Sequence, residues 1–196
     1  MRPTLTHTRS TMRSKLIISS ILFSSLILFL SLVSVDTYNI LPIKTTYSAL
    51  TTEAQKQVTC LAENIYFEAG HEPLEGKKAV AFVTLNRVQS GYADDICGVV
   101  KQKTGNTCQF SWYCDRTFTS RSLTIKQTPL YNEILQLSTN VFLNFERMTD
   151  VTNGATYYHA DYVNPGWTKL KKETQIGRHI FYKSKKDTID RNKGII

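Results

Sequence analysis

Residues 63–87, ENIYFEAGHEPLEGKKAVAFVTLNR, contain the pattern that decides the fold. Apolar residues recur at intervals of three and four over residues 58–69, which is the periodicity of an amphipathic helix. After a short break, small and large apolar residues follow one another so densely that a second helix is expected to be buried on most sides. The sequence therefore predicts two consecutive helices, over about residues 53–69 and 74–89.

One carboxylate of this stretch lies at a helix end. At about 100° per residue, Glu63 points away from the apolar stripe, whereas Glu68 lies near its edge. Gly70 is expected to stop the helix, and Pro73 to open the next one at its first position. The negative end of the helix dipole and partial burial both disfavour an ionised Glu68. Glu68 is therefore either a candidate proton donor for breaking a sugar–sugar bond or an ordinary solvated helix residue.

The C-terminal half predicts one more helix and two strands. An apolar stripe indicates a helix over 129–143. ATYYHA (155–160) and HIFYK (179–183) are rich in β-branched and aromatic residues, which is typical of strands, and a turn signal precedes the first. Residues 91–122 read as a loop-rich region. The expected class is α+β, a mainly helical single domain with a small β element.

The N-terminal region has the composition of a membrane anchor. Residues 16–35, LIISSILFSSLILFLSLVSV, contain no charge over a length that spans a bilayer. Only basic charges precede this run, so the N-terminus is expected to stay in the cytoplasm and the rest to be exported to the extracytoplasmic side of the cell envelope. No good cleavage site follows, which favours an uncleaved signal anchor over a signal peptide. The expected parts are a cytoplasmic basic tail (1–15), a transmembrane helix (16–35), a tether (36–52), the main domain (53–183) and a flexible tail (184–196).

The charge balance suggests an anionic partner. The formal net charge is +8. Four basic residues precede the apolar run, which leaves 20 Lys and Arg against 16 Asp and Glu, or +4, for residues 36–196. A mildly basic surface favours an anionic polymer. Nucleic acid would fit the charge equally well, but an exported domain argues against it.

Four cysteines lie in the exported part, and an even number in an oxidising compartment indicates disulfides. Three pairings are open. A zinc site would require close pairs such as C-x-x-C, which the spacing does not offer, and the histidines lack an H-E-x-x-H spacing. We therefore expect neither a metal nor a cofactor. The disulfide candidates are Cys60, Cys97, Cys108 and Cys114.

Five segments share the pattern of one known family and occur in its order: IYFEAGHEPLEGKKAVAFVTLNRV (65–88), CGVVKQ (97–102), CQFSWYCD (108–115), GATYYHADYVNPGW (154–167) and IGRHIFYK (176–183). They resemble the SleB/CwlJ-type cell wall hydrolases, the spore-cortex-lytic enzyme family, over roughly residues 58–183. The resemblance implies a lysozyme-like, mostly helical catalytic domain. It also implies cleavage of peptidoglycan glycan strands between N-acetylmuramic acid and N-acetylglucosamine.

The resemblance assigns the catalytic role to Glu68. The family pattern is E-A-basic-G-E; Glu68 corresponds to its first glutamate and Glu72 to its second. This chain departs from the pattern, because Gly70 and His71 stand where the family has a basic residue and then Gly. The resemblance further suggests a lytic transglycosylase, in which one glutamate protonates the glycosidic oxygen and then serves as base.

Three other activities stay open at this point. A hydrolytic muramidase or glucosaminidase on the same scaffold would use a second carboxylate. A non-catalytic peptidoglycan-binding envelope protein would bind without cleaving, and a peptide-cleaving amidase would need zinc or a nucleophile pair. The candidates for a second carboxylate are Glu72, Glu75, Asp94, Asp95 and Asp115.

Substrate contacts are expected from one loop and one strand. In the loop between two cysteines, Trp112 either stacks on a sugar or packs as local core, and Phe110 is expected to be core. On the strand, Tyr157 and His159 share one face and Tyr158 takes the other. The resemblance favours Tyr158 or His159 near the substrate, with a buried structural histidine as the alternative. The substrate-binding candidates are Glu72, Gln109, Ser111, Trp112, Tyr158 and His159.

Two further positions have open or structural interpretations. Trp167, in a Pro-Gly loop, is either a sugar platform or a plug that closes the domain. Asn86 and Arg87 lie at the end of the second predicted helix. We interpret them as structural, with the arginine completing the helix end.

Overall fold

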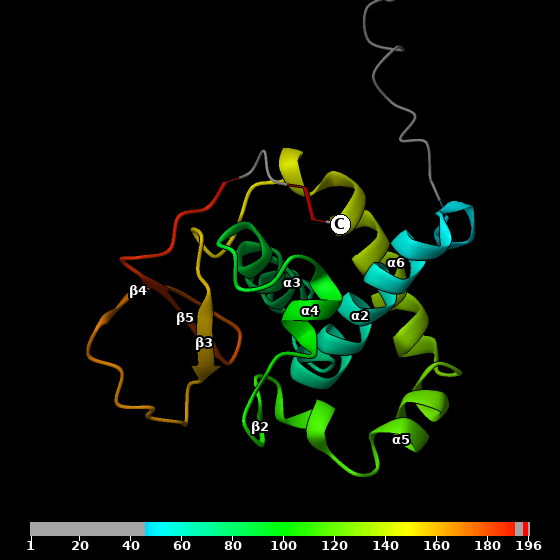
Figure 1. Cartoon of the computed structure of the whole chain (residues 1–196), viewed down its shortest axis with the longest axis horizontal. Helices are drawn as coiled ribbons and strands as arrows, with labels where there is room; N and C mark the ends of the chain where they lie inside the picture. The colour runs from blue at the N-terminus through cyan, green and yellow to red at the C-terminus, as the bar shows by residue number, and fades with distance from the viewer. Residues whose placement is uncertain (1–45, 191–193, 196) are drawn as a thin grey trace, which may run out of the picture. The chain divides into compact units, whose positions relative to one another are not determined.

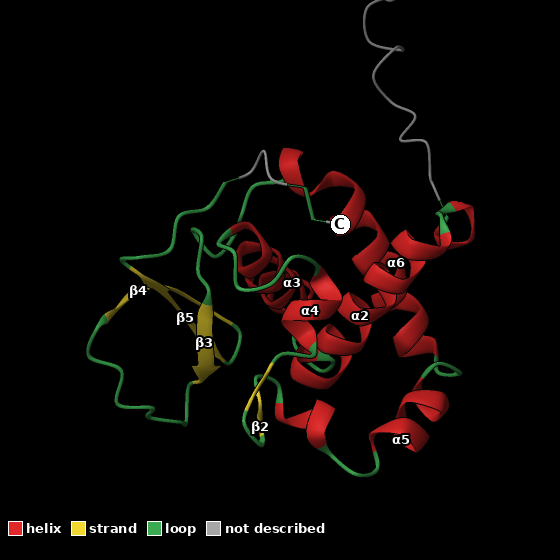
Figure 2. Ribbon diagram, in the orientation of Figure 1, coloured by secondary structure: helices red, strands yellow, loops and turns green. Residues whose placement is uncertain are grey.

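The computed structural model describes residues 46–190 and 194–195. The predicted cytoplasmic tail, transmembrane segment and most of the tether lie outside the described residues. Within the described part, no helix is long and apolar enough to cross a membrane. That part is mainly helical with two small sheets (Figures 1 and 2), which confirms the expected α+β class with a small β element.

Two predicted helices are present with nearly the predicted bounds. Helix α2 spans Thr52–Ala69 and α3 spans Leu74–Gln89. The side chain of Thr51 accepts a hydrogen bond from the backbone N–H of Ala54 and caps α2. Pro73 precedes α3 as its N-cap instead of occupying the first helical position. Gly70 ends α2 with a φ of −55°, so this helix end is right-handed and does not use the left-handed glycine stop that we expected.

A third long helix completes the helical core. Helix α6 spans Pro129–Asn144, as predicted to within one residue, and packs against α2. Of two shorter helices, α4 (Ile96–Val100) lies within the region that we expected to be loop-rich, and α5 (Phe118–Ile125) begins in it. Each is too short to show a clear apolar period. The core residues with under 2% exposure include Leu61, Ile65, Phe82, Leu85, Ile134 and Phe145.

The β structure consists of one hairpin inside the loop-rich region and one sheet after α6. A two-residue hairpin pairs β1 (Lys103–Thr104) with β2 (Thr107–Cys108). A second, antiparallel sheet has the order β3-β5-β4, with β3 at Tyr157–Ala160, β4 at Leu170–Ile176 and β5 at His179–Ser184. The sequence predicted β3 and β5 but not β4, whose residues LKKETQI are mostly polar. The short 3-10 helices are η1 (Tyr47–Ala49), η2 (Ser111–Cys114) and η3 (Phe145–Arg147).

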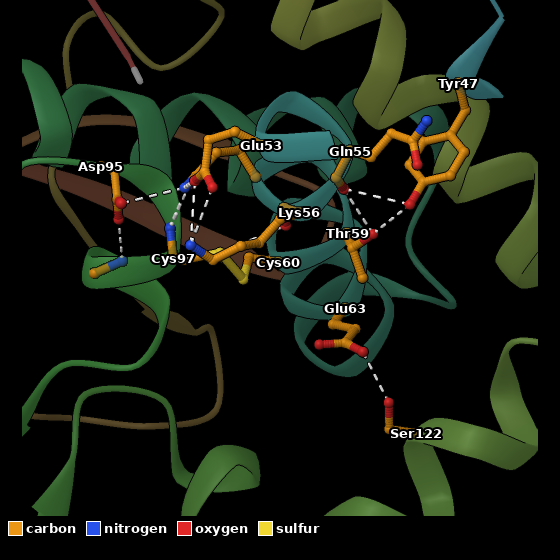
Figure 3. Close-up of a disulfide and its surroundings, with 12 residues drawn as sticks. Tyr47, Glu53, Gln55, Lys56, Thr59, Cys60, Glu63, Asp95, Cys97 and Ser122 are labelled. Atoms are coloured by element: carbon orange, nitrogen blue, oxygen red, sulfur yellow. Dashed lines mark hydrogen bonds and ion pairs between the residues drawn. A yellow bond between two sulfur atoms is a disulfide. The ribbon is translucent and has the colours of Figure 1, made fainter. Parts of the chain in front are cut away.

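Two disulfides select one of the three open pairings. Cys60 of α2 is bonded to Cys97 of α4, and Cys108 to Cys114. Hydrogen bonds reinforce the first bridge (Figure 3), because the Gln57 side chain accepts from the backbone N–H of Cys97 and donates to Asp95. The short helix α4 is therefore fixed to α2 by both covalent and polar contacts.

Glu63, which we expected to point away from the apolar stripe of α2, is nevertheless buried. It is only 7% exposed and accepts a hydrogen bond of 2.7 Å from the hydroxyl of Ser122 (Figure 3). It also pairs with Lys126 at 2.9 Å. Both partners come from α5 and the residue after it. Glu63 is buried because α5 covers the side of α2 on which it lies.

The expected flexible tail is partly tied to the fold. Asp187 accepts hydrogen bonds from the hydroxyl of Tyr92 at 3.1 Å and from the backbone N–H of Ser184 at 3.1 Å. The hydroxyl of Thr156 also donates to this carboxylate. The first residues of the tail therefore belong to the packed domain.

Candidate active site

Glu68 lies in the last turn of α2, where it is half-buried. Its Oε2 accepts a hydrogen bond of 2.9 Å from the hydroxyl of Tyr158 on β3. Burial raises the pKa of the Glu68 carboxyl, while the Tyr158 hydrogen bond and the positive charge of Arg87 act in the opposite direction. The direction of this pKa shift is the one expected from the sequence, with burial as the main cause. The group can therefore hold its proton at a higher pH than an exposed glutamate.

Tyr158 is held against the helices by its neighbours on the sheet. It lies opposite Phe181 in the β3–β5 register, and the rings of His179 and Phe181 lie 5.2 and 5.7 Å from its ring. Burial and the adjacent Glu68 carboxylate raise the Tyr158 pKa well above its ordinary value. The phenol is therefore a proton-bearing hydrogen-bond donor throughout the neutral range.

His159 lies on the other face of the sheet, as strand alternation predicted. Its ring stacks on Tyr182 at 5.2 Å, and its Nε2 lies 3.1 Å from the Tyr182 hydroxyl. Of the two strand candidates, the structure brings Tyr158 to Glu68 and places His159 elsewhere.

Arg87 is a buried cation beside the Glu68–Tyr158 pair. It is 3% exposed, and its Nε donates a hydrogen bond of 2.7 Å to the backbone oxygen of Thr156. Its Nη1 has no hydrogen-bond partner among the described residues. Its charge favours ionised Glu68. The sequence interpretation of Arg87 as a helix-end residue missed this role, because periodicity cannot distinguish an arginine buried under a strand from one that faces solvent.

Three aromatic rings surround this guanidinium. They lie 5.3–5.9 Å from its central carbon and belong to Tyr92, Phe110 and Tyr157. Such rings attract a cation through their negative faces, which offsets part of the cost of burying the charge. Phe110 is 4% exposed, so its prediction as a core residue is confirmed.

Glu72 holds a turn of the sheet. Its Oε2 accepts a hydrogen bond of 3.0 Å from the backbone N–H of Arg178, in the turn between β4 and β5. Gly177 in the same turn has a φ of 57°, and a Cβ at this position would overlap the Glu72 carboxylate. The turn leads directly into His179, whose ring contacts Tyr158. Glu72 is therefore linked to Tyr158 through this turn and His179.

His179 packs beside Tyr158 in the site. Burial lowers its pKa, and the charges of Glu72 and Asp161 act in the opposite direction. It is 8% exposed, and its Nδ1 has no hydrogen-bond partner within the described part of the chain. His179 is therefore a neutral imidazole that packs against the ring of Tyr158.

The candidates in the disulfide-closed loop separate into core and surface. Trp112 is 8% exposed, stacks on Phe67 at 4.8 Å and donates from Nε1 to the side-chain oxygen of Asn64 at 3.3 Å. This geometry matches the local-core alternative. Gln109 and Ser111 are exposed on the same loop. Because Phe67 directly precedes Glu68, Trp112 supports the backbone of the site.

The described residues contain no group of three His, Cys, Asp or Glu side chains placed to hold a metal ion. The site contains the half-buried carboxyl of Glu68, the phenol donor of Tyr158 and the buried cation of Arg87.

Comparison with known families identifies the chain. A family model described as Cell Wall Hydrolase matches residues 71–182, more than half of the chain. The chain belongs to this cell wall hydrolase family. The resemblance to SleB/CwlJ-type hydrolases is thereby confirmed. The matched region begins three residues after Glu68, so it includes Glu72 and the sheet but not the candidate proton donor.

Curated relatives of this cell wall hydrolase are longer than the chain. A spore cortex-lytic enzyme of Oceanobacillus iheyensis is 29% identical over 133 residues, which cover 66% of this chain and 42% of the relative. One from Halalkalibacterium halodurans is 27% identical over 131 residues, which cover 65% of this chain and 35% of the relative. The chain thus spans about two fifths or less of these proteins.

Two solved structures are also similar to this hydrolase domain. The catalytic domain of Bacillus cereus SleB is 24% identical with a TM-score of 0.47, over 66% of this chain and 91% of that one. The catalytic domain of the germination-specific lytic transglycosylase SleB of Bacillus anthracis is 24% identical with a TM-score of 0.48. That comparison covers 66% of this chain and 95% of the other.

Proposed function

We propose that this chain cleaves the glycan strands of peptidoglycan as a lytic transglycosylase, with Glu68 as its single acid and base. The observation that carries the proposal is the state of Glu68: a half-buried carboxyl with a raised pKa that also accepts a hydrogen bond from Tyr158. Such a group can hold a proton and is also stabilised after losing it. Membership of the cell wall hydrolase family and the names of the curated relatives support the substrate class.

The proposed reaction returns Glu68 to its starting state. The protonated carboxyl gives its proton to the glycosidic oxygen, the bond from that oxygen to the muramic acid C1 breaks, and N-acetylglucosamine leaves with a hydroxyl. The Glu68 carboxylate then removes the proton from the muramic acid C6 hydroxyl, whose oxygen bonds to C1. The product carries a 1,6-anhydro ring and no water is consumed. Between the two steps, the Tyr158 hydroxyl and the Arg87 charge stabilise the carboxylate.

The other candidate carboxylates make structural contacts, which favours a mechanism with one glutamate. Glu72 accepts from Arg178, Glu75 pairs with Lys78, and Asp95 caps α4 through Gly98. A hydrolytic glycosidase needs a second carboxylate about 5–9.5 Å from the first, free to act as nucleophile or base.

Asp94 and Asp115, the two remaining candidates, are exposed. Asp115 accepts hydrogen bonds from Thr117 and pairs with Arg121 at 2.9 Å. Its contacts hold the start of α5 and do not point to a role beside Glu68.

The test is product analysis on intact murein sacculi with the full 196-residue chain. Mass spectrometry of the soluble products is expected to show anhydro-muropeptides that disappear with Glu68→Gln, while Glu75→Gln, an exposed glutamate, retains activity. Reducing-end products would replace the transglycosylase mechanism by hydrolysis on the same scaffold. Murein binding without any soluble product would instead indicate a non-catalytic envelope protein, and cut peptide stems would indicate an amidase.

A further inference from the structure

A cluster of rings lies on the face of the β3-β5-β4 sheet opposite the face that carries Tyr158 and Phe181. Tyr157 and His159 of β3 lie on this face, opposite Tyr182 and Ile180 in the register. Trp167, from the connection between β3 and β4, lies across them. Its ring is 5.5–5.7 Å from the rings of Tyr157, His159 and Tyr182, edge to face in each case.

This outer ring cluster is fixed but accessible. Trp167 is 39% exposed although three rings hold it, so part of its indole surface faces solvent in a defined orientation. Tyr162, in the same connection, is 74% exposed, and the guanidinium of Arg178 lies 5.4 Å from its ring. Aromatic faces presented in this way suit the apolar C–H face of a sugar ring, and their polar edges can hydrogen-bond to its hydroxyls.

The segment that forms the cluster is rich in basic residues, and at least one of them, Lys172, lies on the face of the rings. Residues 161–186 contain seven basic side chains against two acidic ones, Asp161 and Glu173, and Glu173 is already paired with Lys171 at 3.0 Å. Lys172 lies opposite Tyr182 in the β4–β5 register, so strand alternation places it on the same face as the rings. The basic residues are Lys169, Lys171, Lys172, Arg178, Lys183, Lys185 and Lys186.

The cluster also adjoins the Glu68 site. Tyr157, at the edge of the cluster, lies 5.8 Å from the guanidinium of Arg87, whose charge acts on Glu68. The outer ring cluster is therefore linked to the Glu68 site through the buried Arg87.

We propose that this outer face is a second binding surface for the peptidoglycan strand, where Trp167 stacks on a sugar and Lys172 attracts the carboxylates of the peptide stems. The proposal rests on the proposed function for its substrate class. The combination of exposed rings and basic side chains matches a polymer that alternates sugars with acidic groups. A membrane surface would fit less well, because Val163 is the only exposed large aliphatic side chain between β3 and β4. Such a surface would hold the insoluble polymer near Glu68 between cleavage events.

The test measures binding without cleavage. The full chain with Glu68→Gln is co-sedimented with murein sacculi, alone and combined with Trp167→Ala or Lys172→Glu. Matched controls are Leu123→Ala, which truncates a side chain 64% exposed on α5, and Arg147→Glu, which reverses an exposed charge on η3. Thermal unfolding verifies that each variant is folded, and Lys172→Glu keeps the test valid if Trp167→Ala does not fold.

We expect Trp167→Ala to weaken murein binding about tenfold, which corresponds to about 1.4 kcal/mol. Lys172→Glu should weaken it several-fold at low salt and by less at high salt, because exposed charges are screened. Both controls should bind like the parent. The inference is overturned if the Trp167 and Lys172 variants bind murein as the controls do. It is also overturned if they lose binding only to vesicles of anionic phospholipid, which would identify a membrane-binding face. Because every variant carries Glu68→Gln, neither outcome depends on whether the native chain cleaves murein.

Discussion

The hydroxyl of Tyr158 meets the carboxyl of Glu68 at 2.9 Å across a sequence separation of 90 residues. Glu68 ends a helix and Tyr158 lies on a strand, so this bond joins the helical part of the domain to the sheet. Burial favours the protonated acid, whereas the phenol donor favours the carboxylate. An acid that must later act as a base needs both influences, because either one alone would trap the group in one form.

Replacement of Tyr158 by Phe removes the donor and keeps the ring. Because the hydrogen bond lowers the pKa of Glu68, its loss should raise that pKa further. Activity that requires protonated Glu68 should then persist to higher pH, and the basic limb of the kcat/KM profile should move upward. The rate at the optimum should fall because the carboxylate form loses its donor. Tyr113→Phe, on a tyrosine outside this contact, is the control. An unmoved basic limb would show that Tyr158 does not tune Glu68.

Glu68→Gln should also change how stability depends on pH. Burial raises the folded-state pKa of Glu68 above its ordinary value of 4.5, so the folded state binds this proton more tightly than the unfolded chain. The associated stability is fully present below 4.5 and is lost as pH rises through the folded-state pKa. The free energy of unfolding of the native chain should therefore fall, relative to Glu68→Gln, between acidic and neutral pH. Urea unfolding at several pH values measures this difference, and parallel curves for the two proteins would contradict it.

The helices that place Glu68 could be predicted from the sequence because each carries a local signal. The bounds of α2 and α3 follow from apolar spacing and from Pro73. By contrast, α4 and β4 leave little periodic trace: one has five residues and the other is mostly polar. Helix α4 is held by a partner far along the chain, through the Cys60–Cys97 disulfide, whereas β4 is held by pairing with β5, the next strand.

For the candidate site too, the sequence predicts the features that are local and misses those that depend on distant elements. Glu68 could be singled out because its helix end and apolar neighbours are local features. The role of Arg87 and the burial of Glu63 depend on β3 and α5, which approach from 69 and 59 residues away. Family resemblance narrowed the strand candidates to Tyr158 or His159, and strand alternation put them on opposite faces. The packing of the sheet against the helices, seen in the Tyr158–Glu68 contact, determines which of those faces meets α2.

Arg87 offers a way to separate charge from hydrogen bonding. Arg87→Met removes the cation that favours ionised Glu68, so the pKa of Glu68 and the basic limb of the activity profile should both rise. It also leaves the buried oxygen of Thr156 without this donor, which should cost about 1–3 kcal/mol of unfolding free energy. Arg87→Lys keeps a positive charge but cannot reproduce the planar fork. It should therefore lose stability while its basic limb stays near that of the native chain. Equal shifts of that limb in both variants would reduce Arg87 to a packing role.

The contact between Glu72 and the β4–β5 turn predicts a measurable coupling. Gly177→Ala should lose stability twice, first because its φ of 57° disfavours an L side chain and second because the new Cβ overlaps the Glu72 carboxylate. Glu72→Ala alone should cost about 0.5–1.5 kcal/mol for the lost bond to Arg178.

In the double variant the overlap is gone, so Gly177→Ala should cost less than it does beside Glu72, by roughly 0.5–3 kcal/mol. Gly105→Ala is the matched control: its φ is 60°, but no atom lies within 4 Å of the new Cβ, so its cost should not depend on Glu72. Because the turn positions His179 against Tyr158, Gly177→Ala should lower activity and Gly105→Ala should not. Additive stability losses for Glu72→Ala and Gly177→Ala would mean that the carboxylate does not hold the turn, and Glu72 would then be available to the substrate.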